Sequence, residues 1–289
     1  MLKCPCCGGQ TSVKTNEPAC RICDLHPSPD GRLWLSKQDS TPSGFDSASA
    51  ERLTDLVAQN HFWTRERTHL TAKLLDRMAA TRRSTWTSAI ELGCGSGNML
   101  DLLEQRVPTV TAMDGHRSLL NQARQVTKRS TLVQGDVTRT ELAPSQFDLL
   151  LSMDVIEHVD PDALLSEARR IAKPGADLLI SVPAFPSLWS NMDQRAGHRC
   201  RYRWRQMKNE LEHNGWQPSG HTHFQFFLFP LVYASRQWAG SASHTTERRP
   251  SKILDRCLGA INHLEVRWLN SLPLPFGSSL FVWAKAANP

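Results

Sequence analysis

The spacing of apolar residues changes along the chain, and each change predicts a different kind of element. From 51 to 80, apolar residues recur every three or four positions, which predicts one or two amphipathic helices. After Trp86, short apolar runs alternate with segments of helical periodicity. We expect strands at 89–92, 109–113, 131–134, 147–153 and 177–183, and helices at 98–106, 118–127 and 161–172. This alternation predicts a mostly parallel sheet with helices on both faces.

The last third of the chain is less regular. A helix at 203–214 is expected to end at Gly215, and strands are expected at 216–224 and 278–285. The stretch between those two strands is rich in Phe and Leu and has a polar interruption at 241–252. So long an excursion indicates a helical insertion before the last strand of the sheet.

The composition excludes several classes of protein. The chain has 289 residues, 40% of them hydrophobic and 21% charged, which is enough for one large domain with a small appendage. Its longest strongly apolar stretch, 226–234, is far shorter than the roughly 20 residues of a membrane-spanning helix. The first residues lack the apolar core of a signal peptide, so we expect a cytoplasmic protein. The formal net charge of +6 favours anionic partners, either nucleic acid or lipid headgroups.

The cysteines are concentrated at the start of the chain, where five of the eight lie within the first 23 residues. Cys4 and Cys7 form one Cys-x-x-Cys pair, and Cys20 and Cys23 form a second pair after twelve intervening residues. This spacing predicts a tetrahedral zinc site of the ribbon type. Because four thiolates leave no open coordination position, the zinc is expected to be structural, and Cys6 remains a spare thiol.

These patterns divide the chain into six parts. The first is a zinc ribbon at 1–30, and the second is a linker at 31–50 that is rich in Ser, Pro, Gly and Asp. The others are N-terminal helices at 51–85, the core at 86–223, an apolar helical insertion at 224–275 and the final strand at 276–289. The expected fold class is therefore α/β, with a small metal-binding appendage.

A glycine-rich turn joins the first expected core strand to the helix that follows. Gly93, Gly95 and Gly97 stand where the backbone must turn sharply and approach a ligand without a Cβ in the way. A dinucleotide-binding turn would place its third glycine at position 98, which is Asn98 here. The turn therefore argues against NAD and for a ligand without a pyrophosphate.

Two carboxylates follow at the ends of the next two strands. Asp114 is placed to accept hydrogen bonds from a ribose diol, and Asp136 is placed to receive an adenine amino group. Open parallel sheets bind ligands at the carboxyl ends of their strands. Three consecutive strand ends therefore predict a nucleoside-binding edge.

Several motifs of the core occur in a fixed order, namely Glu91-x-Gly-x-Gly-x-Gly97, Asp114, Gly135-Asp136, 147–154 and 168–175. They resemble the motifs of class I S-adenosylmethionine-dependent methyltransferases, best over 86–183, and 61–67 and 188–202 are similar to a bacterial subgroup of these enzymes. The resemblance implies a seven-stranded Rossmann-like sheet with a reversed last strand, bound S-adenosylmethionine and methyl transfer to an acceptor. The cofactor-binding residues that it implies are Glu91, Gly93, Cys94, Gly95, Gly97, Asp114, Gly115, Asp136, Val137 and Met153.

Asp154, Glu157 and His158 follow the fourth core strand. If this segment turns as a helix, the spacing places all three side chains on one face. The cluster resembles the magnesium site of ubiquinone-pathway O-methyltransferases and of small-RNA 2′-O-methyltransferases, where the ion holds acceptor hydroxyls. We prefer the alternative, a metal-free Glu-His pair that shapes the helix start and the acceptor site.

The stretch from 188 to 202 is polar and rich in basic residues, which is typical of a lid over an acceptor. His198 is the expected general base and Asp193 is expected to orient it. His158 and Tyr202 complete the predicted catalytic residues. A solvated basic loop is the alternative interpretation. Methyl transfer is an in-line displacement at a sulfonium carbon, so the protein mainly has to hold donor and acceptor in line.

The apolar segment 224–236 is followed by the basic residues Arg248, Arg249, Lys252 and Arg256, a combination suited to an anionic membrane or a greasy acceptor. Burial of the segment against the sheet is the alternative. We expect methylation, most plausibly at oxygen, of a small hydrophobic or lipid-like acceptor by a cytoplasmic enzyme or one peripheral to the inner face of the membrane. An RNA methyltransferase and an S-adenosylmethionine-binding scaffold without turnover are the alternatives. The sequence leaves the acceptor and the oligomeric state open.

Overall fold

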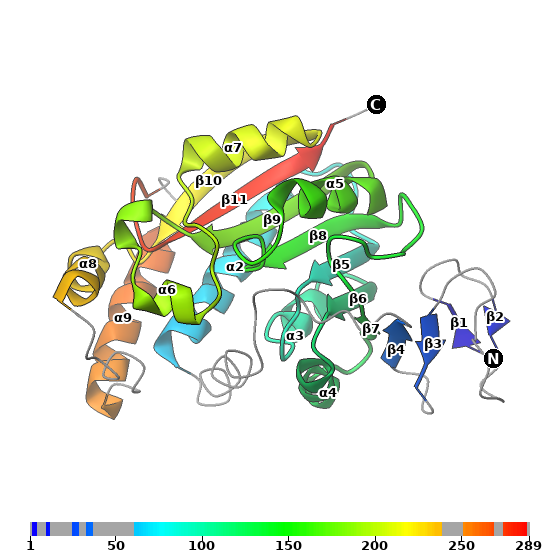
Figure 1. Cartoon of the computed structure of the whole chain (residues 1–289), viewed down its shortest axis with the longest axis horizontal. Coiled ribbons are helices and arrows are strands. Elements are labelled where there is room, and N and C mark those ends of the chain that lie inside the picture. The colour runs from blue at the N-terminus through cyan, green and yellow to red at the C-terminus, as the bar shows by residue number, and fades with distance from the viewer. Residues whose placement is uncertain are drawn as a thin grey trace.

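A sheet of nine strands runs through the part of the chain that the computed structural model describes, which comprises 2–4, 10–11, 25–28, 33–36, 61–238, 251–268 and 274–287 (Figure 1). Its order is β10-β11-β9-β8-β5-β6-β7-β4-β3. The main strands are β5 (Ser88–Leu92), β6 (Thr109–Asp114), β7 (Thr131–Gln134), β8 (Phe147–Met153), β9 (Ala172–Pro183), β10 (Trp216–Phe224) and β11 (Ser279–Ala286). Strands β5 to β9 are parallel, and β11 runs antiparallel to both of its neighbours. The expected seven strands with a reversed last strand are present, but β4 and β3 extend the sheet beyond the seven that were predicted.

The core helices follow the predicted order with small shifts at their ends. They are α3 (Leu100–Glu104), α4 (Arg117–Val126), α5 (Pro161–Ile171) and α7 (Trp204–His213). Helix α3 begins later than expected because the glycine turn extends to its first residue. Strand β9 begins earlier than expected, directly after α5. Gly215 has φ +75°, the left-handed conformation predicted for the end of α7.

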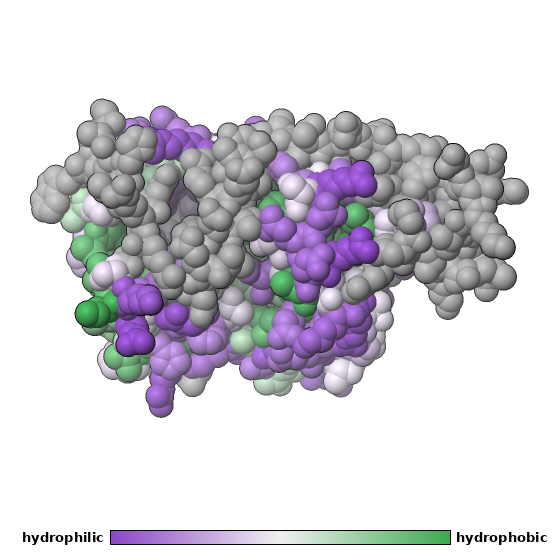
Figure 2. All heavy atoms as spheres, turned by 90° about the horizontal axis from the view of Figure 1, so that it is seen from below, coloured by the Kyte–Doolittle hydropathy of each residue, from purple (hydrophilic) through white to green (hydrophobic). Residues whose placement is uncertain are grey.

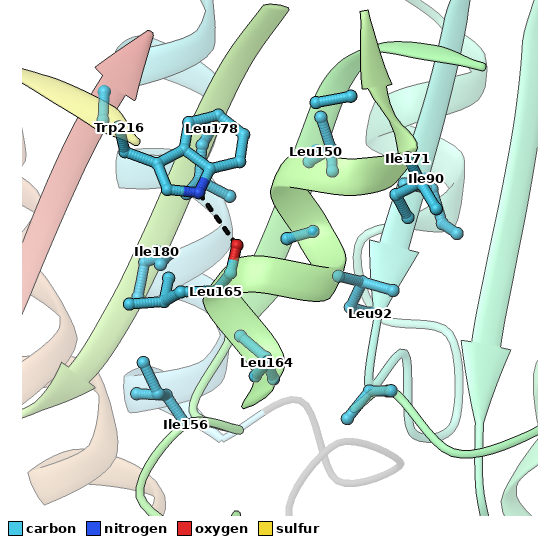
Figure 3. Close-up of a cluster of buried hydrophobic side chains, with 14 of the residues drawn as sticks. Ile90, Leu92, Leu150, Ile156, Leu164, Leu165, Ile171, Leu178, Ile180 and Trp216 are labelled. Atoms are coloured by element: carbon cyan, nitrogen blue, oxygen red, sulfur yellow. Dashed lines mark hydrogen bonds between the residues drawn. The ribbon is translucent and has the colours of Figure 1, made fainter. Parts of the chain in front are cut away.

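Two apolar cores, one on each face of the sheet, hold these elements together. Alternate residues of β8 face opposite sides, so Leu150 joins the core under α5 and α7, whereas Leu149 and Leu151 join the core under α2 (Phe62–Ala80), α3 and α4. In the first core, Trp216 packs beside α5 and its indole Nε1 donates a hydrogen bond of 3.1 Å to the carbonyl of Leu165 (Figure 3). Helices therefore cover both faces, as the alternating pattern predicted.

The sheet continues beyond β7 through β4 (Leu33–Ser36), which pairs with it in parallel, and β3 (Leu25–Pro27), which pairs with β4. We expected 31–50 to be a linker, and β4 corrects that expectation for residues 33–36. Leu33 and Trp34 are each only 2% exposed, because an apolar strand at an open sheet edge gains both burial and backbone hydrogen bonds.

The predicted zinc ribbon lies mostly outside the described residues. A two-stranded pair, β1 (Leu2–Lys3) and β2 (Gln10–Thr11), and the buried Cys4 are described there. Cys6, Cys7, Cys20 and Cys23 are outside the described residues. The zinc site therefore stays a prediction.

The insertion between β10 and β11 contains α8 (Phe229–Trp238) and α9 (Lys252–Trp268), and α9 packs against α2 (Figure 1). The helical pattern expected from 51 is described from Phe62 onward, where α2 begins. Among the helices that the structure describes, none combines the length and the apolar character needed to cross a bilayer.

Candidate cofactor and acceptor site

The glycine turn after β5 is built on left-handed backbone. Gly93, Gly95 and Gly97 have φ values of +79°, +53° and +89°, which side chains with a Cβ rarely adopt. The amides of Gly93 and Cys94 donate to the carbonyl of Met113 at 2.8 and 2.9 Å, which fastens the turn to the end of β6. A Cβ at Gly93 would overlap the side chain of Val155, so the turn also touches the loop after β8.

Asp114 at the end of β6 is fixed by backbone amides on both sides. Its carboxylate accepts one hydrogen bond of 2.8 Å from the amide of Gly95 and another of 2.8 Å from the amide of His116. These bonds use only part of the acceptor capacity of a carboxylate. Asp114 can therefore accept further hydrogen bonds from a diol while its orientation stays fixed by the turn. Gly115 follows directly and carries the chain into α4.

The remaining predicted cofactor residues stand at the ends of β7 and β8. Asp136 is exposed, and its Oδ1 accepts from the amide and the hydroxyl of Thr138 at 2.8 and 2.7 Å. Val137 is buried in the apolar core, and Met153 is half-buried at the end of β8. Because β5 to β8 are parallel, the predicted cofactor residues gather at one edge of the sheet.

Glu91 and Cys94 bring buried acid groups to this edge. Burial, together with the negative charge of Asp114, raises the pKa of Glu91 well above its usual range. Burial also raises the pKa of the Cys94 thiol, so that this group is neutral at pH 7. Among the described residues, Oε2 of Glu91 has no hydrogen-bond partner. Two neighbouring carboxylates of this kind favour a positively charged ligand.

Asp154 begins the loop after β8 with φ +57°, a conformation that is costly for a residue other than glycine. Its carboxylate forms an ion pair with Arg67 of α2 and accepts a hydrogen bond of 3.2 Å from Ser181. Arg67 is nearly buried and lies 4.4 Å from the centre of the Trp63 ring. Asp154 therefore binds α2 to the sheet, whereas the sequence had grouped it with Glu157 and His158.

Glu157 and His158 are joined by His198 from the lid rather than by Asp154. Their potential ligand atoms all lie within 4.8 Å of one another, and the two imidazole rings meet edge to face at 5.0 Å. Burial and the charge of Asp154 raise the pKa of Glu157 well above its usual range. Both of its carboxylate oxygens are buried without a hydrogen-bond partner among the described residues. Burial and the nearby His198 lower the pKa of His158 to about 4, so its imidazole is neutral at pH 7.

His198 and Asp193 form the pair that the sequence predicted. The segment predicted to be a lid, called the lid from here on, comprises a short 3-10 turn at Pro186–Leu188, α6 (Asn191–Arg195) and the loop up to Tyr202. Nδ1 of His198 lies 2.9 Å from Oδ1 of Asp193, and the amide of Arg199 donates to the carbonyl of Glu157 at 2.7 Å. That backbone bond places His198 next to the loop after β8. Asp193 contacts the ring through Nδ1, so Nε2 does not take part in this contact.

Asp193 is buried among positive groups. Arg201 donates to it at 2.8 and 2.7 Å, and Arg236 of α8 donates at 2.8 Å. Burial alone would raise the pKa of Asp193, but the hydrogen bond from His198 and the two arginines hold it well below its usual range. Asp193 therefore stays ionised and keeps the ring of His198 in place.

Tyr202 is fully buried, and its side chain belongs to the apolar core beside α7. Its backbone pairs with the end of β9, since the amide of Tyr202 donates to the carbonyl of Pro183 at 2.9 Å. Burial raises the pKa of its hydroxyl far above the usual range. The structure therefore gives Tyr202 the contacts of a residue that anchors the lid.

Arg236 is the site residue that the sequence analysis missed. It lies in α8, more than forty residues from Asp193 in sequence, and it also donates to the carbonyl of Leu188 at 3.1 Å. The only signal in the sequence was an arginine at the end of an apolar helical segment. A partner so distant in sequence cannot be assigned from local spacing.

The strand order with its reversed last strand, together with the three-glycine turn, resembles that of class I S-adenosylmethionine-dependent methyltransferases. Residues 90–180 match the family model described as "Methyltransferase domain". Residues 90–180 are thus similar in sequence to a methyltransferase domain.

Known proteins that resemble the chain point to the same class. A methyltransferase-like protein of Encephalitozoon cuniculi is 33% identical over 146 residues, which are 49% of this chain and 65% of that protein. The ubiquinone biosynthesis O-methyltransferase of Pseudomonas paraeruginosa is 29% identical over 100 residues, 32% of this chain and 43% of the relative. The alignments thus span less than two thirds of either relative.

Among solved structures, a methyltransferase from a complex with the Haloferax volcanii Trm112 methyltransferase activator has a TM-score of 0.57 and 16% identity. That match covers 86% of this chain and 100% of the other. Geranyl diphosphate C-methyltransferase of Streptomyces coelicolor has a TM-score of 0.52 and 13% identity, covering 75% and 77% of the two chains. At these identities the similarity shows the fold.

Proposed function

We propose that the protein transfers the methyl group of S-adenosylmethionine to an oxygen atom of a small, apolar or lipid-like acceptor. The fixed carboxylate of Asp114 beside the left-handed glycine turn carries the cofactor half of this proposal. The acidic neighbours Glu91 and Asp114 suit a ligand that bears a sulfonium and an ammonium group. The similarity to a ubiquinone biosynthesis O-methyltransferase supports oxygen as the acceptor atom and an apolar acceptor.

In the proposed reaction, the acceptor oxygen attacks the methyl carbon in line with the bond to sulfur. The oxygen–carbon bond forms as the carbon–sulfur bond breaks, and S-adenosylhomocysteine leaves as a neutral thioether. His198 takes the hydroxyl proton on Nε2, while Asp193 holds the Nδ1 side of the ring. Because Arg201 and Arg236 neutralise Asp193, its role is to orient the base rather than to accept the proton.

Glu157, His158 and His198 also fit a divalent ion. A buried carboxylate without partners beside two imidazoles is a donor set for a borderline ion such as zinc, whereas magnesium prefers oxygen ligands. An ion held there would polarise the acceptor hydroxyl. Activity that survives removal of loosely bound metal with EDTA would favour His198 acting as a base without a metal.

The surface of α9 supports a lipid-like acceptor. Ile253, Ile261, Leu264 and Trp268 recur at intervals of one or two turns along its exposed side, with Ile253 75% and Trp268 70% exposed. Its inner face is mostly polar instead, with Asn262 completely buried there and Val266 as its apolar member. A helix with its apolar stripe outward has the pattern of an interfacial helix rather than that of a core helix.

Charges on α9 complement an anionic bilayer. Lys252, Arg256 and Arg267 are exposed, whereas its acids Asp255 and Glu265 are buried. Apolar and polar surface lie side by side at the end of the molecule that carries α8 and α9 (Figures 1 and 2). We therefore propose that α9 lies in the interface of an anionic membrane, where a lipid-like acceptor would be delivered to the lid.

Mass spectrometry tests the transfer directly. The purified protein, S-adenosylmethionine and fractionated lipid extract or RNA are incubated, and products that gain one CH2 are sought, with His198→Ala as the matched control. A methylated apolar product that needs His198 supports the proposal. A methylated nucleoside would instead establish the RNA alternative, and the absence of any product with intact cofactor binding would favour a scaffold.

Vesicle sedimentation tests the membrane contact. Wild-type protein should bind phosphatidylglycerol-rich vesicles and not neutral phosphatidylcholine vesicles, and the double change Ile261→Asp and Leu264→Asp should abolish binding. Val126→Asp is the control, because Val126 is an exposed apolar residue on α4. Equal behaviour on both kinds of vesicle, or a dimer that the α9 change dissociates, would overturn this contact.

A further inference from the structure

A second cluster of metal-ligating side chains lies away from the acceptor loops, between α2 and α9. It consists of Glu66 and His69, which are one turn apart on α2, and His263 on α9. We propose that these three residues bind a first-row divalent ion of the zinc type, which ties the inserted helix α9 to α2. The inference is independent of the proposed reaction.

The three groups already converge on one point. Oε2 of Glu66 lies 3.0 Å from Nδ1 of His69 and 3.2 Å from Nδ1 of His263. A tetrahedral ion with bonds of about 2.0–2.1 Å spaces its ligand atoms about 3.3 Å apart. All three potential ligand atoms are within 4.8 Å of one another, so small rotations of two rings would admit the ion.

The chemistry of the donors selects the kind of ion. Two imidazoles and one carboxylate suit zinc, cobalt or nickel, whereas calcium and magnesium prefer ligand sets made of oxygen. Oε1 of Glu66 accepts a hydrogen bond of 3.0 Å from Nε of Arg65. Such an outer bond orients a ligating carboxylate and leaves Oε2 directed at the imidazoles.

The burial of the cluster provides both an anchor and an entry path. Glu66 is almost completely buried, while His69 and His263 are half-exposed at the surface. An ion can therefore enter from water and complete its coordination with water molecules, as three-ligand sites do. The buried carboxylate of Glu66 would hold the ion in place, and the rings of His69 and His263 would bind it from the surface side.

The ion would add to the polar contacts between α2 and α9. The amide of Phe62 donates to Asp255 of α9 at 3.3 Å, and Nζ of Lys73 donates to the carbonyl of Val266 at 2.7 Å. Glu66 and His263 are 197 positions apart in sequence, so an ion between them joins two distant segments. An ion that binds only the folded arrangement stabilises it.

Cobalt(II) absorption and metal titration test the site on the full-length protein. Wild type is compared with His263→Ala, with His69→Ala as a second variant, and with His213→Ala, which removes an exposed histidine of α7. Metal bound by the predicted cysteine site, or by Glu157, His158 and His198, is common to all four proteins and cancels in the difference spectra. The difference therefore reports only the cluster on α2 and α9.

Wild type and His213→Ala should bind one more cobalt ion than either cluster variant, with the weak visible bands of nitrogen and oxygen ligands. The remaining affinity of the variants for this ion should fall at least about tenfold, because even outer partners of a metal site have effects of that size. Zinc should raise the unfolding temperature of wild type and His213→Ala more than that of the cluster variants. Equal stoichiometry and equal thermal shifts in all four proteins would overturn the site and leave a hydrogen-bonded trio.

Discussion

The cofactor edge and the acceptor side of this molecule hold their charged groups in different ways. At the cofactor edge, Asp114 is fixed by backbone amides of its own and the neighbouring strand end. On the acceptor side, Asp193 is held by Arg201, His198 and Arg236, and Arg236 belongs to the insertion. A site made from backbone turns can be recognised in a short motif, whereas a site made from distant side chains depends on the whole fold.

The two regions also differ in how rigid their chemistry has to be. The cofactor edge uses left-handed glycines, which leave no room for alternatives at Gly93. The acceptor side instead buries groups without partners, such as both carboxylate oxygens of Glu157 among the described residues. Buried groups of this kind are costly unless a ligand or ion satisfies them. The geometry of the cofactor edge is therefore fixed by its own backbone, whereas the buried groups of the acceptor side need a ligand or ion to satisfy them.

The largest effect is expected from removing the proposed base. His198→Ala should lower the rate of methyl transfer about 10²–10⁴-fold, the range usual for general acid–base catalysis. Binding of S-adenosylhomocysteine should stay within a factor of about two, since His198 belongs to the acceptor side. Rates come from product formation and affinity from calorimetry. If His198→Ala also weakened the binding of S-adenosylhomocysteine, the cofactor edge and the acceptor side would not act separately.

Asp114→Ala should have the next largest effect, and only on the cofactor edge. The change removes the acceptor for the amide of Gly95 and the proposed ribose contact, so the dissociation constant of S-adenosylhomocysteine should rise about 100-fold. Asp136→Ala is the comparison, because Asp136 is exposed and should cost about tenfold or less. If calorimetry gave equal affinities for wild type and Asp114→Ala, Asp114 would not bind the ribose of the cofactor.

Alanine substitutions at two glycines distinguish the cost of backbone strain from the cost of a steric overlap. Gly93→Ala should lower the free energy of unfolding by about 3 kcal/mol, because its Cβ would strain the left-handed backbone and overlap Val155. Gly175→Ala should cost only about 1–2 kcal/mol, since Gly175 has φ +69° but nothing within 4 Å of the added Cβ. Urea unfolding measures both. Equal losses would show that packing against the loop after β8 contributes little.

At neutral pH the smallest effect is expected for His158, whose contribution to stability depends on pH. Its pKa is lowered from 6.5 to about 4 in the folded protein, so between these values the unfolded chain binds more protons. The stability contribution of the neutral ring is therefore lost as the pH falls from 6.5 to about 4. Urea unfolding in EDTA at several pH values should show a smaller acid loss for His158→Gln than for wild type. An unchanged pH profile would mean that the ring is not desolvated.

Much of the fold could be predicted from the sequence because its elements depend on residues that are close together in the chain. Alternating apolar runs predicted the strands β5 to β9, and the spacing of Gly93, Gly95 and Gly97 predicted the turn. The strand at Leu33 and Trp34 was not predicted, because an apolar triplet in a polar stretch becomes a strand only where a sheet edge accepts it. Its pairing depends on β7, about a hundred residues away.

The site could be predicted only in part, because some of its contacts join residues that are far apart in the sequence. His198 and Asp193 are five residues apart and were paired from the sequence, and the structure brings them to 2.9 Å. Asp154 was grouped with Glu157 by spacing, but the loop turns it toward Arg67 on α2. Helical spacing predicts a shared face only when the segment is a helix, and this segment is a turn with a left-handed residue.

By itself the sequence determined the alternation of strands and helices, the glycine turn and the acids at the strand ends, because each follows from residues close together in the chain. Only the tertiary structure decided that Arg236 reaches Asp193, that His198 joins Glu157 and His158, and that α9 turns its apolar side outward. Those contacts join segments far apart in sequence, so no local spacing encodes them. They form because the sheet and its helices fix where each segment can lie.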